Sequence, residues 1–281
     1  MMDKAKKVID EADVILITAG AGMGVDSGLP DFRGNEGMWK EYPALKKQKI
    51  DFESIANPKQ FQWRPELIWA FYGHRFDLYK KTTPNVGFDA LRELVKNKKD
   101  YFIVTSNVDG QFQKAGFDTD KIYEVHGRIN KFQCTSCNAT PWKAPDKLPF
   151  KIDGRNFKVK GDLPMCPKCG ALARPNIMMF SDFHFQGDET SEQNQRFNKF
   201  MHSYDKGPHK IAIIEIGAGT AISTIRDIGD NIHENLDNAQ LIRINPREAF
   251  GPKDVISVRQ GGVAALTEIL PEDIKKMFFI K

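Results

Sequence analysis

Three polar side chains follow predicted strands at positions suited to chemistry. Asn107 and Asp109 come directly after the apolar run at 101–105, and His126 follows the short strand expected at 121–125. In a doubly wound sheet, polar residues just past the carboxyl end of a strand line the ligand crevice. An imidazole with an unperturbed pKa of about 6.5 suits general base catalysis near neutrality. These residues are catalytic candidates, although Asn107 and Asp109 could instead cap the next helix and His126 could be structural.

The four cysteines form two C-x-x-C pairs, Cys134 with Cys137 and Cys166 with Cys169. Two such pairs are typical of a tetrahedral zinc site with four thiolate ligands, and a site closed by four protein ligands is structural rather than catalytic. The spacer between the pairs carries several prolines and lysines and is expected to be an irregular ribbon rather than a core. No cysteine remains for a disulfide, which favours a reducing, cytoplasmic setting.

A glycine-rich loop at 20–28 follows a short apolar strand at 14–17. Glycine admits positive φ and lets an anion approach bare N–H groups, so such a loop can hold the phosphates of a dinucleotide. The spacing differs from G-x-G-x-x-G, and no acidic residue ends an obvious second strand about 20 residues later. A tight turn without phosphate therefore remains an alternative. Residues 30–34 add an Asp, an aromatic and an Arg, as a cofactor flap would.

The segment 65–76 begins with Pro and carries apolar residues at helical spacing, which predicts a helix. Trp69 and Phe71 are expected in the core, because aromatic residues at this spacing usually face inward. Tyr72 and Arg75 lie three residues apart on one face. An Arg beside a phenol can bind a carboxylate through two N–H groups, but surface packing would explain the pair equally well.

The candidates need a sheet whose strands end at a common edge. Strand and helix patterns alternate along the rest of the chain, with strands expected at 210–216, 240–245 and 255–258 and helices at 88–95, 188–202 and 263–270. We therefore predict an α/β fold, a Rossmann-like doubly wound parallel sheet into which a smaller zinc-ribbon and helical module is inserted.

Composition sets the broad class. The 281 residues are enough for a full core, as one large domain or two small ones. The 41 basic and 37 acidic residues give a net charge of +4 that is spread along the chain, which suits a small acidic ligand and does not argue for nucleic acid. The N-terminal segment lacks a long apolar run, so neither a signal peptide nor a membrane span is expected.

The motifs resemble those of the sirtuins, the NAD-dependent protein deacylases, in a bacterial-type form. The glycine loop resembles G-A-G-x-S-x-x-S-G-I-P-D-F-R, residues 105–109 resemble T-Q-N-I-D, and residues 125–127 resemble L-H-G. The cysteine pairs, the turn at Gly217 and the dipeptide 244–245 follow in the family's order. The resemblance covers nearly the whole chain and implies an NAD co-substrate and one structural Zn²⁺.

The resemblance also implies roles for individual residues. His126 would be the general base, and Asn107 and Asp109 would bind the ribose and the carboxamide of nicotinamide. The extended segment with Ile177, Met178 and Phe180 would pair with the substrate backbone by strand addition. The implied NAD-binding set is Gly20, Ala21, Gly22, Asp31, Phe32, Arg33, Ser106, Asn107, Asp109, Gly217, Gly219, Thr220, Asn245, Gly262 and Val263.

The implied activity is NAD-dependent removal of acyl groups from lysine in proteins or peptides, giving nicotinamide, free lysine and O-acyl-ADP-ribose. Neither nucleic acid nor a membrane is an expected partner. The chain departs from the family pattern at Gly24, Ser106, Arg128 and the dipeptide 181–182, where Ser, Gln, Ser and Gly-Glu are usual.

Tyr72 and Arg75 match a pair that some family members use to bind acidic acyl groups such as succinyl. We therefore hypothesise a preference for a carboxylated acyl chain.

Two alternatives to deacylation remain. One is mono-ADP-ribosyl transfer to protein or plain NAD hydrolysis, as some relatives perform, and the other is a non-enzymatic module that binds or senses NAD. The resemblance also suggests a division of the chain. It assigns 1–34, 76–130 and 175–281 to the Rossmann-like NAD-binding domain, 35–75 to a cofactor flap and helical insert, and 131–174 to the zinc ribbon.

Overall fold

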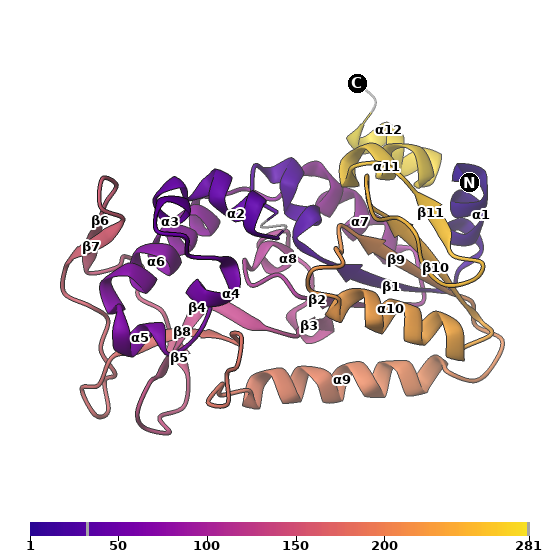
Figure 1. Ribbon diagram of the computed structural model, residues 1–281. Coiled ribbons are helices and arrows are strands. Elements are labelled where there is room, and N and C mark those ends of the chain that lie inside the picture. Colours follow the sequence, from indigo (N-terminus) through magenta and orange to yellow (C-terminus); the bar gives the residue numbers. More distant parts are fainter. Residues whose placement is uncertain (32–33, 280–281) are drawn as a thin grey trace.

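The computed structural model describes residues 1–31 and 34–279 and is built on a parallel sheet of six strands (Figure 1). The strand order is β11-β10-β9-β1-β2-β3, which is the Rossmann order with the switch point between β1 and β9. The predicted α/β fold is confirmed. The strands are β1 (Val14–Ala19), β2 (Asp100–Thr105), β3 (Ile122–Glu124), β9 (Ile211–Ile216), β10 (Ala239–Ile244) and β11 (Ile256–Val258).

Side chains alternate between the two faces of this sheet, because successive residues of a strand point in opposite directions. In β1, Ile15 and Ile17 pack on one helical layer, while Val14 and Leu16 pack on the other. Figure 1 shows these layers above and below the sheet. The first layer is α1 (Met2–Glu11), α7 (Val86–Lys96), α11 (Gly262–Ile269) and α12 (Glu272–Phe278); the second is α9 (Asp188–Tyr204) and α10 (Thr224–Asn235).

A second, separate core lies beside the sheet, and it buries Trp69 and Phe71 completely, as predicted. The indole Nε1 of Trp69 donates a hydrogen bond to the carbonyl oxygen of Ala173, which ties the helices to the small sheet. The helices are α2 (Gly34–Glu41), α3 (Pro43–Lys47), α4 (Phe52–Ile55), α5 (Gln60–Trp63) and α6 (Pro65–Lys81). The small antiparallel sheet contains β5 (Trp142–Lys143), β4 (Gly127–Cys134) and β8 (Ala173–Ile177), in that order.

The spacer between the cysteine pairs is more ordered than predicted. It forms a hairpin of β6 (Phe150–Asp153) and β7 (Lys158–Gly161), and its turn residue Phe157 and strand residue Val159 are buried in the second core. The ring of Phe157 lies 5.3 Å from that of Tyr42. A ribbon that looks polar in sequence therefore contributes apolar side chains to the packing.

Helix α6 runs without interruption across the predicted domain boundary between residues 75 and 76. Phe76 and Tyr79, beyond that boundary, pack in the second core with the rest of the helix. A boundary after Lys81 would follow this packing, and the division of the chain into domains remains a prediction.

Candidate functional site

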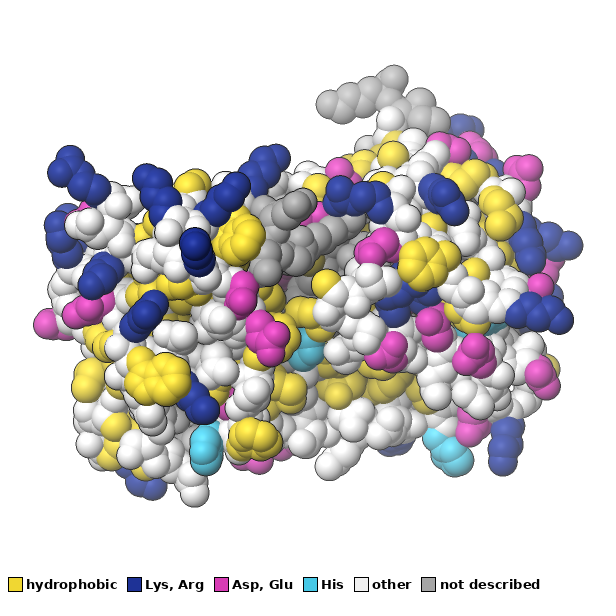
Figure 2. Space-filling view, viewed as in Figure 1, with side chains coloured by type: hydrophobic (Ala, Val, Ile, Leu, Met, Phe, Trp, Pro, Cys, Tyr) yellow, Lys and Arg dark blue, Asp and Glu magenta, His cyan; other side chains and the backbone are white. Residues whose placement is uncertain are grey.

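A cleft at the carboxyl ends of β1, β2 and β9 separates the sheet from the second core. Hydrophobic side chains gather in the hollow between the two parts of the molecule (Figure 2). The cleft is lined by most of the residues that the sequence nominated: Gly20, Ala21, Asp31, Tyr72, Arg75, Ser106, Asn107, Asp109, His126, Ile177, Met178, Phe180, Gly217 and Gly219.

The glycine loop after β1 packs directly on the loop after β9. The N–H of Gly22 donates to the carbonyl oxygen of Gly217 at 3.0 Å. A Cβ atom at Gly217, whose φ is +66°, would lie 2.3 Å from Cα of Gly22, and a Cβ at Gly20 would lie 2.7 Å from the Gly217 oxygen. Glycine is needed at this switch point because two backbones meet there. The same loops expose backbone at the place where a Rossmann sheet holds a dinucleotide, so they fit NAD.

The unusual Gly24 has a local explanation. A Cβ atom at this position would lie 3.1 Å from Cδ1 and 3.3 Å from Cβ of Leu29. A side chain at this position would therefore press on Leu29, which would have to shift by a few tenths of an ångström.

Three other predicted cofactor residues are engaged by the protein itself. Asn245 is fully buried, and its amide donates to the carbonyl oxygen of Ala218 at 2.8 Å. The hydroxyl of Thr220 donates to the carboxylate of Glu248, and the N–H of Val263 donates to Asp26 at 2.9 Å. These residues shape the far end of the site. Gly22 and Gly262 line a second hollow there, which shares Asp31 and Gly217 with the cleft, whereas Phe32 and Arg33 lie outside the described residues.

His126 lies between β3 and β4, where it faces the cleft. Burial lowers the pKa of its imidazole below the usual 6.5, so the ring is neutral at pH 7 and can accept a proton. Its carbonyl oxygen accepts the N–H of Met178 at 3.0 Å. Arg128, another departure, pairs with Glu124 at 2.6 Å and Glu189 at 2.9 Å, which ties this turn to α9.

Asn107 and Asp109 both make local contacts and both face the cleft. The amide of Asn107 donates to the carbonyl oxygen of Gly20 at 2.9 Å, which joins the ends of β2 and β1. One carboxylate oxygen of Asp109 accepts the N–H of Gln111 at 2.9 Å, at the start of the short helix α8 (Gln111–Lys114). Burial raises the pKa of Asp109 to about 6. Asp109 can therefore cap the following helix and still line the site.

Tyr72 and Arg75 form part of the cleft wall and are not at the surface, since only 1% and 8% of their area is exposed. The guanidinium lies over the rings of Tyr72 and Tyr79, at 5.7 and 5.4 Å from their centres. Its Nε and Nη2 both donate to the hydroxyl of Tyr79, at 2.9 and 2.8 Å. Sequence reasoning missed Tyr79, although its spacing of four residues from Arg75 places both on one helix face.

The predicted substrate segment continues from β8, an edge strand of the small sheet. The N–H groups of Met178 and Phe180 donate to the carbonyl oxygens of His126 and Ala56. The carboxylate of Asp182, whose side chain is inaccessible to solvent, pairs with Arg174 and accepts the N–H of Met179 at 3.3 Å.

Ser181, which precedes Asp182, is the other residue of the dipeptide that departs from the pattern given above. Ser181 has a φ of +54°, a left-handed backbone conformation that favours glycine.

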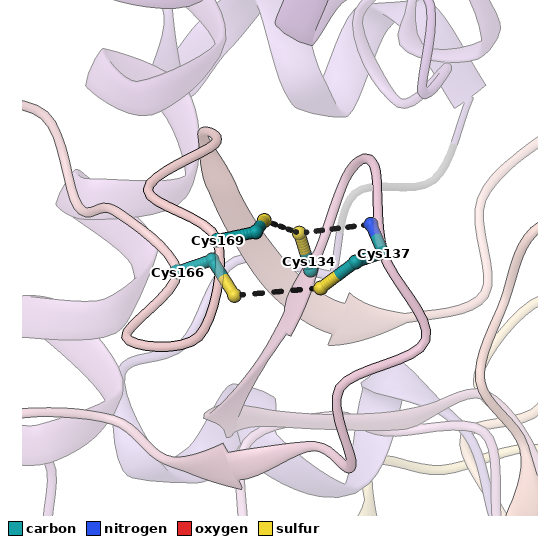
Figure 3. Close-up of side chains that lie close together, drawn as sticks. All are labelled: Cys134, Cys137, Cys166 and Cys169. Atoms are coloured by element: carbon teal, nitrogen blue, oxygen red, sulfur yellow. Dashed lines mark hydrogen bonds between the residues drawn. The ribbon is translucent and has the colours of Figure 1, made fainter.

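The four cysteines cluster at one end of β4, with all their sulfur atoms within 4.8 Å of one another (Figure 3). The sulfurs of Cys134 and Cys169 are 3.5 Å apart, and those of Cys137 and Cys166 are 3.8 Å apart. Tetrahedral zinc with Zn–S bonds of about 2.3 Å separates its sulfur ligands by about 3.8 Å. The cluster therefore fits one structural zinc ion.

A Rossmann-ordered sheet with a cleft at its switch point and a four-cysteine ribbon defines a dinucleotide-binding type of α/β protein. Residues 20–205 match the model of the Sir2 family, which is more than half of the chain. The chain belongs to the Sir2 family, and the predicted resemblance is confirmed.

The chain is similar to several known members of this family. It is 32% identical over 183 residues to the NAD-dependent protein deacylase of Pyrococcus furiosus, a match that covers 65% of this chain and 66% of that protein. The corresponding protein of Thermococcus kodakarensis is 35% identical over 184 residues, with 65% of each chain covered. The chain thus spans just under two-thirds of the length of these relatives. The NAD-dependent protein deacylase of Leptospira interrogans is 28% identical over 95% of this chain and 94% of its own length.

Solved structures agree with the fold. A Sir2 homologue in complex with NAD superimposes with a TM-score of 0.73 at 24% identity, covering 98% of this chain and 94% of that chain. Within residues 1–31 and 34–279, no helix combines the length and apolar character needed to cross a membrane.

Proposed function

We propose that the chain is an NAD-dependent protein lysine deacylase, a transferase that moves the acyl group of lysine to ADP-ribose and releases nicotinamide. The observation that carries the proposal is that Asn107, Asp109 and His126 line one cleft together with the glycine loops after β1 and β9. The names of the Pyrococcus and Leptospira relatives, NAD-dependent protein deacylase, support it.

Each residue has a task in this proposal. NAD, when bound, supplies the ADP-ribosyl group, and nicotinamide is the leaving group of that transfer. Asp109 accepts a hydrogen bond from the carboxamide of nicotinamide, and Asn107 binds the ribose. His126 takes a proton from a ribose hydroxyl, because its lowered pKa keeps it neutral at pH 7.

An acylated peptide lies along the segment 177–180 in the same proposal. The N–H groups of Met178, Met179 and Phe180 are already bonded within the chain, so the substrate donates its own N–H groups to carbonyl oxygens of this segment. Recognition through the backbone accommodates many peptide sequences.

The test of deacylation is the identity of the products from labelled NAD. We expect O-acyl-ADP-ribose to appear only with an acyl-peptide, and His126→Ala to reduce its formation by about 100-fold or more while sparing much of the nicotinamide release. Free ADP-ribose formed without peptide would instead support NAD hydrolysis, and labelled protein would support mono-ADP-ribosyl transfer.

We further propose that Arg75 gives the enzyme a preference for a carboxylated acyl chain such as succinyl. Its buried guanidinium lies in the cleft wall beside Tyr72, whose pKa is raised by burial to about 12, so the phenol stays protonated. Arg75→Ala should lower the ratio of kcat/KM for succinyl-lysine over acetyl-lysine peptides by about 10- to 100-fold. Arg64→Ala, at an exposed position before the same helix, is the control. A ratio unchanged by Arg75→Ala contradicts the preference.

A cytoplasmic location belongs to the same proposal, since the cysteines form a metal site and none is left for a disulfide. Direct binding of nucleic acid is not part of it, because the charge is spread along the chain.

A further inference from the structure

Tyr79 lies one turn beyond Arg75 on α6 and contacts the Nε–Nη2 side of its guanidinium, which can bind a carboxylate. The Nε and Nη2 groups donate to one hydroxyl oxygen, at 2.9 and 2.8 Å. These two N–H groups form one of the edges through which a guanidinium can meet a carboxylate in a bidentate pair. The phenol therefore occupies the position that one oxygen of an acyl carboxylate would take.

The contact also gives the Nε and Nη2 groups of the buried guanidinium an acceptor within the protein. Arg75 is 8% exposed and Tyr79 is 5% exposed, so water reaches them poorly. A buried guanidinium whose N–H groups lack acceptors is strongly destabilising. Tyr79 supplies an acceptor when the bound acyl group is apolar, as acetyl is.

The backbone of Tyr79 is held in place independently of its side chain. Lys114, from α8, donates to the carbonyl oxygens of Tyr79, Lys80 and Thr82 at the end of α6. A carboxylate that takes the Nε–Nη2 edge must therefore displace the phenol by side-chain rotation rather than by movement of the helix.

We propose that Tyr79 is a positioning residue that sets the acyl selectivity of Arg75, by competing with an acyl carboxylate for the Nε–Nη2 edge and by holding this edge when the acyl group is neutral. The inference rests on the proposed deacylase function. It implies that the enzyme accepts both neutral and carboxylated acyl-lysines, with a selectivity that this intramolecular competitor limits.

Tyr79→Phe removes the competing hydroxyl and keeps the ring. We expect the KM for a succinyl-lysine peptide to fall with little change in kcat, so that the succinyl-to-acetyl ratio of kcat/KM rises about five- to tenfold. A merely structural role would lower activity on both peptides alike.

A double-mutant cycle isolates the pair. In an Arg75→Ala background, Tyr79→Phe should leave the ratio unchanged, because the guanidinium for which the phenol and the carboxylate compete is absent. Tyr101→Phe, a partly buried phenol at the far end of β2, is the matched control for loss of a hydroxyl.

The outcomes separate the two proposals. A ratio that stays constant or falls in Tyr79→Phe, with deacylation intact, overturns the role of Tyr79 and leaves the deacylase function standing. Absence of deacylation with every acyl-peptide in the unaltered enzyme overturns the proposed function itself.

Discussion

Asp109 lines the cleft, where its negative charge is disfavoured by burial. Its pKa is about 6 in the folded chain, compared with about 3.8 when solvated, because burial disfavours the carboxylate. Between these two values the folded chain binds a proton that the unfolded chain has released. The contribution of Asp109 to the free energy of unfolding therefore falls as the pH rises from 4 towards 6 and stays lower above 6. A residue kept charged at a stability cost is typical of functional sites.

Asp109→Asn should consequently raise stability while lowering activity. The free energy of unfolding at pH 7 should increase by about 1 to 3 kcal/mol, and the gain should shrink as the pH is lowered to 5. The asparagine oxygen can still accept the N–H of Gln111, so the cap survives. Denaturant unfolding at both pH values measures the effect, and deacylation should fall at least about tenfold. A variant less stable than the parent at pH 7 would argue that the carboxylate is not strained.

The β6–β7 hairpin acts at the scale of secondary-structure elements. It packs across α6, the helix that carries Tyr72, Arg75 and Tyr79, and a Cβ atom at Gly73 would lie only 2.7 Å from the ring of Phe150. The lack of a side chain at Gly73 lets the hairpin approach the helix. The spacer between the cysteine pairs therefore supports, from behind, the helix whose residues line the cleft.

Phe157→Ala tests this support. The buried ring fills the second core, so its removal should cost about 2 to 4 kcal/mol of unfolding free energy and should expose the hairpin to trypsin. Chemical denaturation and limited proteolysis measure both effects. Lys151→Ala, an exposed position on the same hairpin, should behave like the parent. Equal stability of the two variants would show that the hairpin does not brace the second core.

At the scale of the whole molecule, the cysteine cluster is attached to only one of the two cores within the described residues. The zinc cluster lies on β4 and next to β8, which belong to the second core, whereas the parallel sheet contains no cysteine. The amide of Gln186 donates to the carbonyl oxygen of Cys137 at 3.3 Å, and the side chain of Gln133, beside Cys134, accepts the N–H of Gln186 at 3.2 Å. These bonds connect the metal site to the loop after the substrate segment.

Chelation of the metal should therefore loosen the small sheet before the parallel one. Hydrogen exchange should accelerate across 127–177 and the following loop while β1, β2 and β9 remain protected, and metal analysis should find one zinc per chain. Peptide binding should weaken more than NAD binding. Loss of protection in both sheets at once would show that the cores unfold as a single unit.

The amino-acid sequence alone determined the features that depend on local pattern. The strand ends that place Asn107, Asp109 and His126 follow from short apolar runs, and the zinc ligands follow from the C-x-x-C spacing, because both signals lie within a few residues. The parallel sheet was predictable for the same reason, since alternating strands and helices leave few other arrangements.

Tertiary structure decided what depends on residues that are distant in sequence. The glycine spacing reflects contact between the loop at Gly20 and the loop at Gly217, and the raised pKa of Asp109 reflects burial between two cores. Phe157 looked like part of an irregular ribbon, yet it is buried in the second core beside Tyr42. The contact of Tyr79 with Arg75 is visible only in the structure, because packing sets the hydrogen-bond geometry and neither composition nor periodicity predicts it.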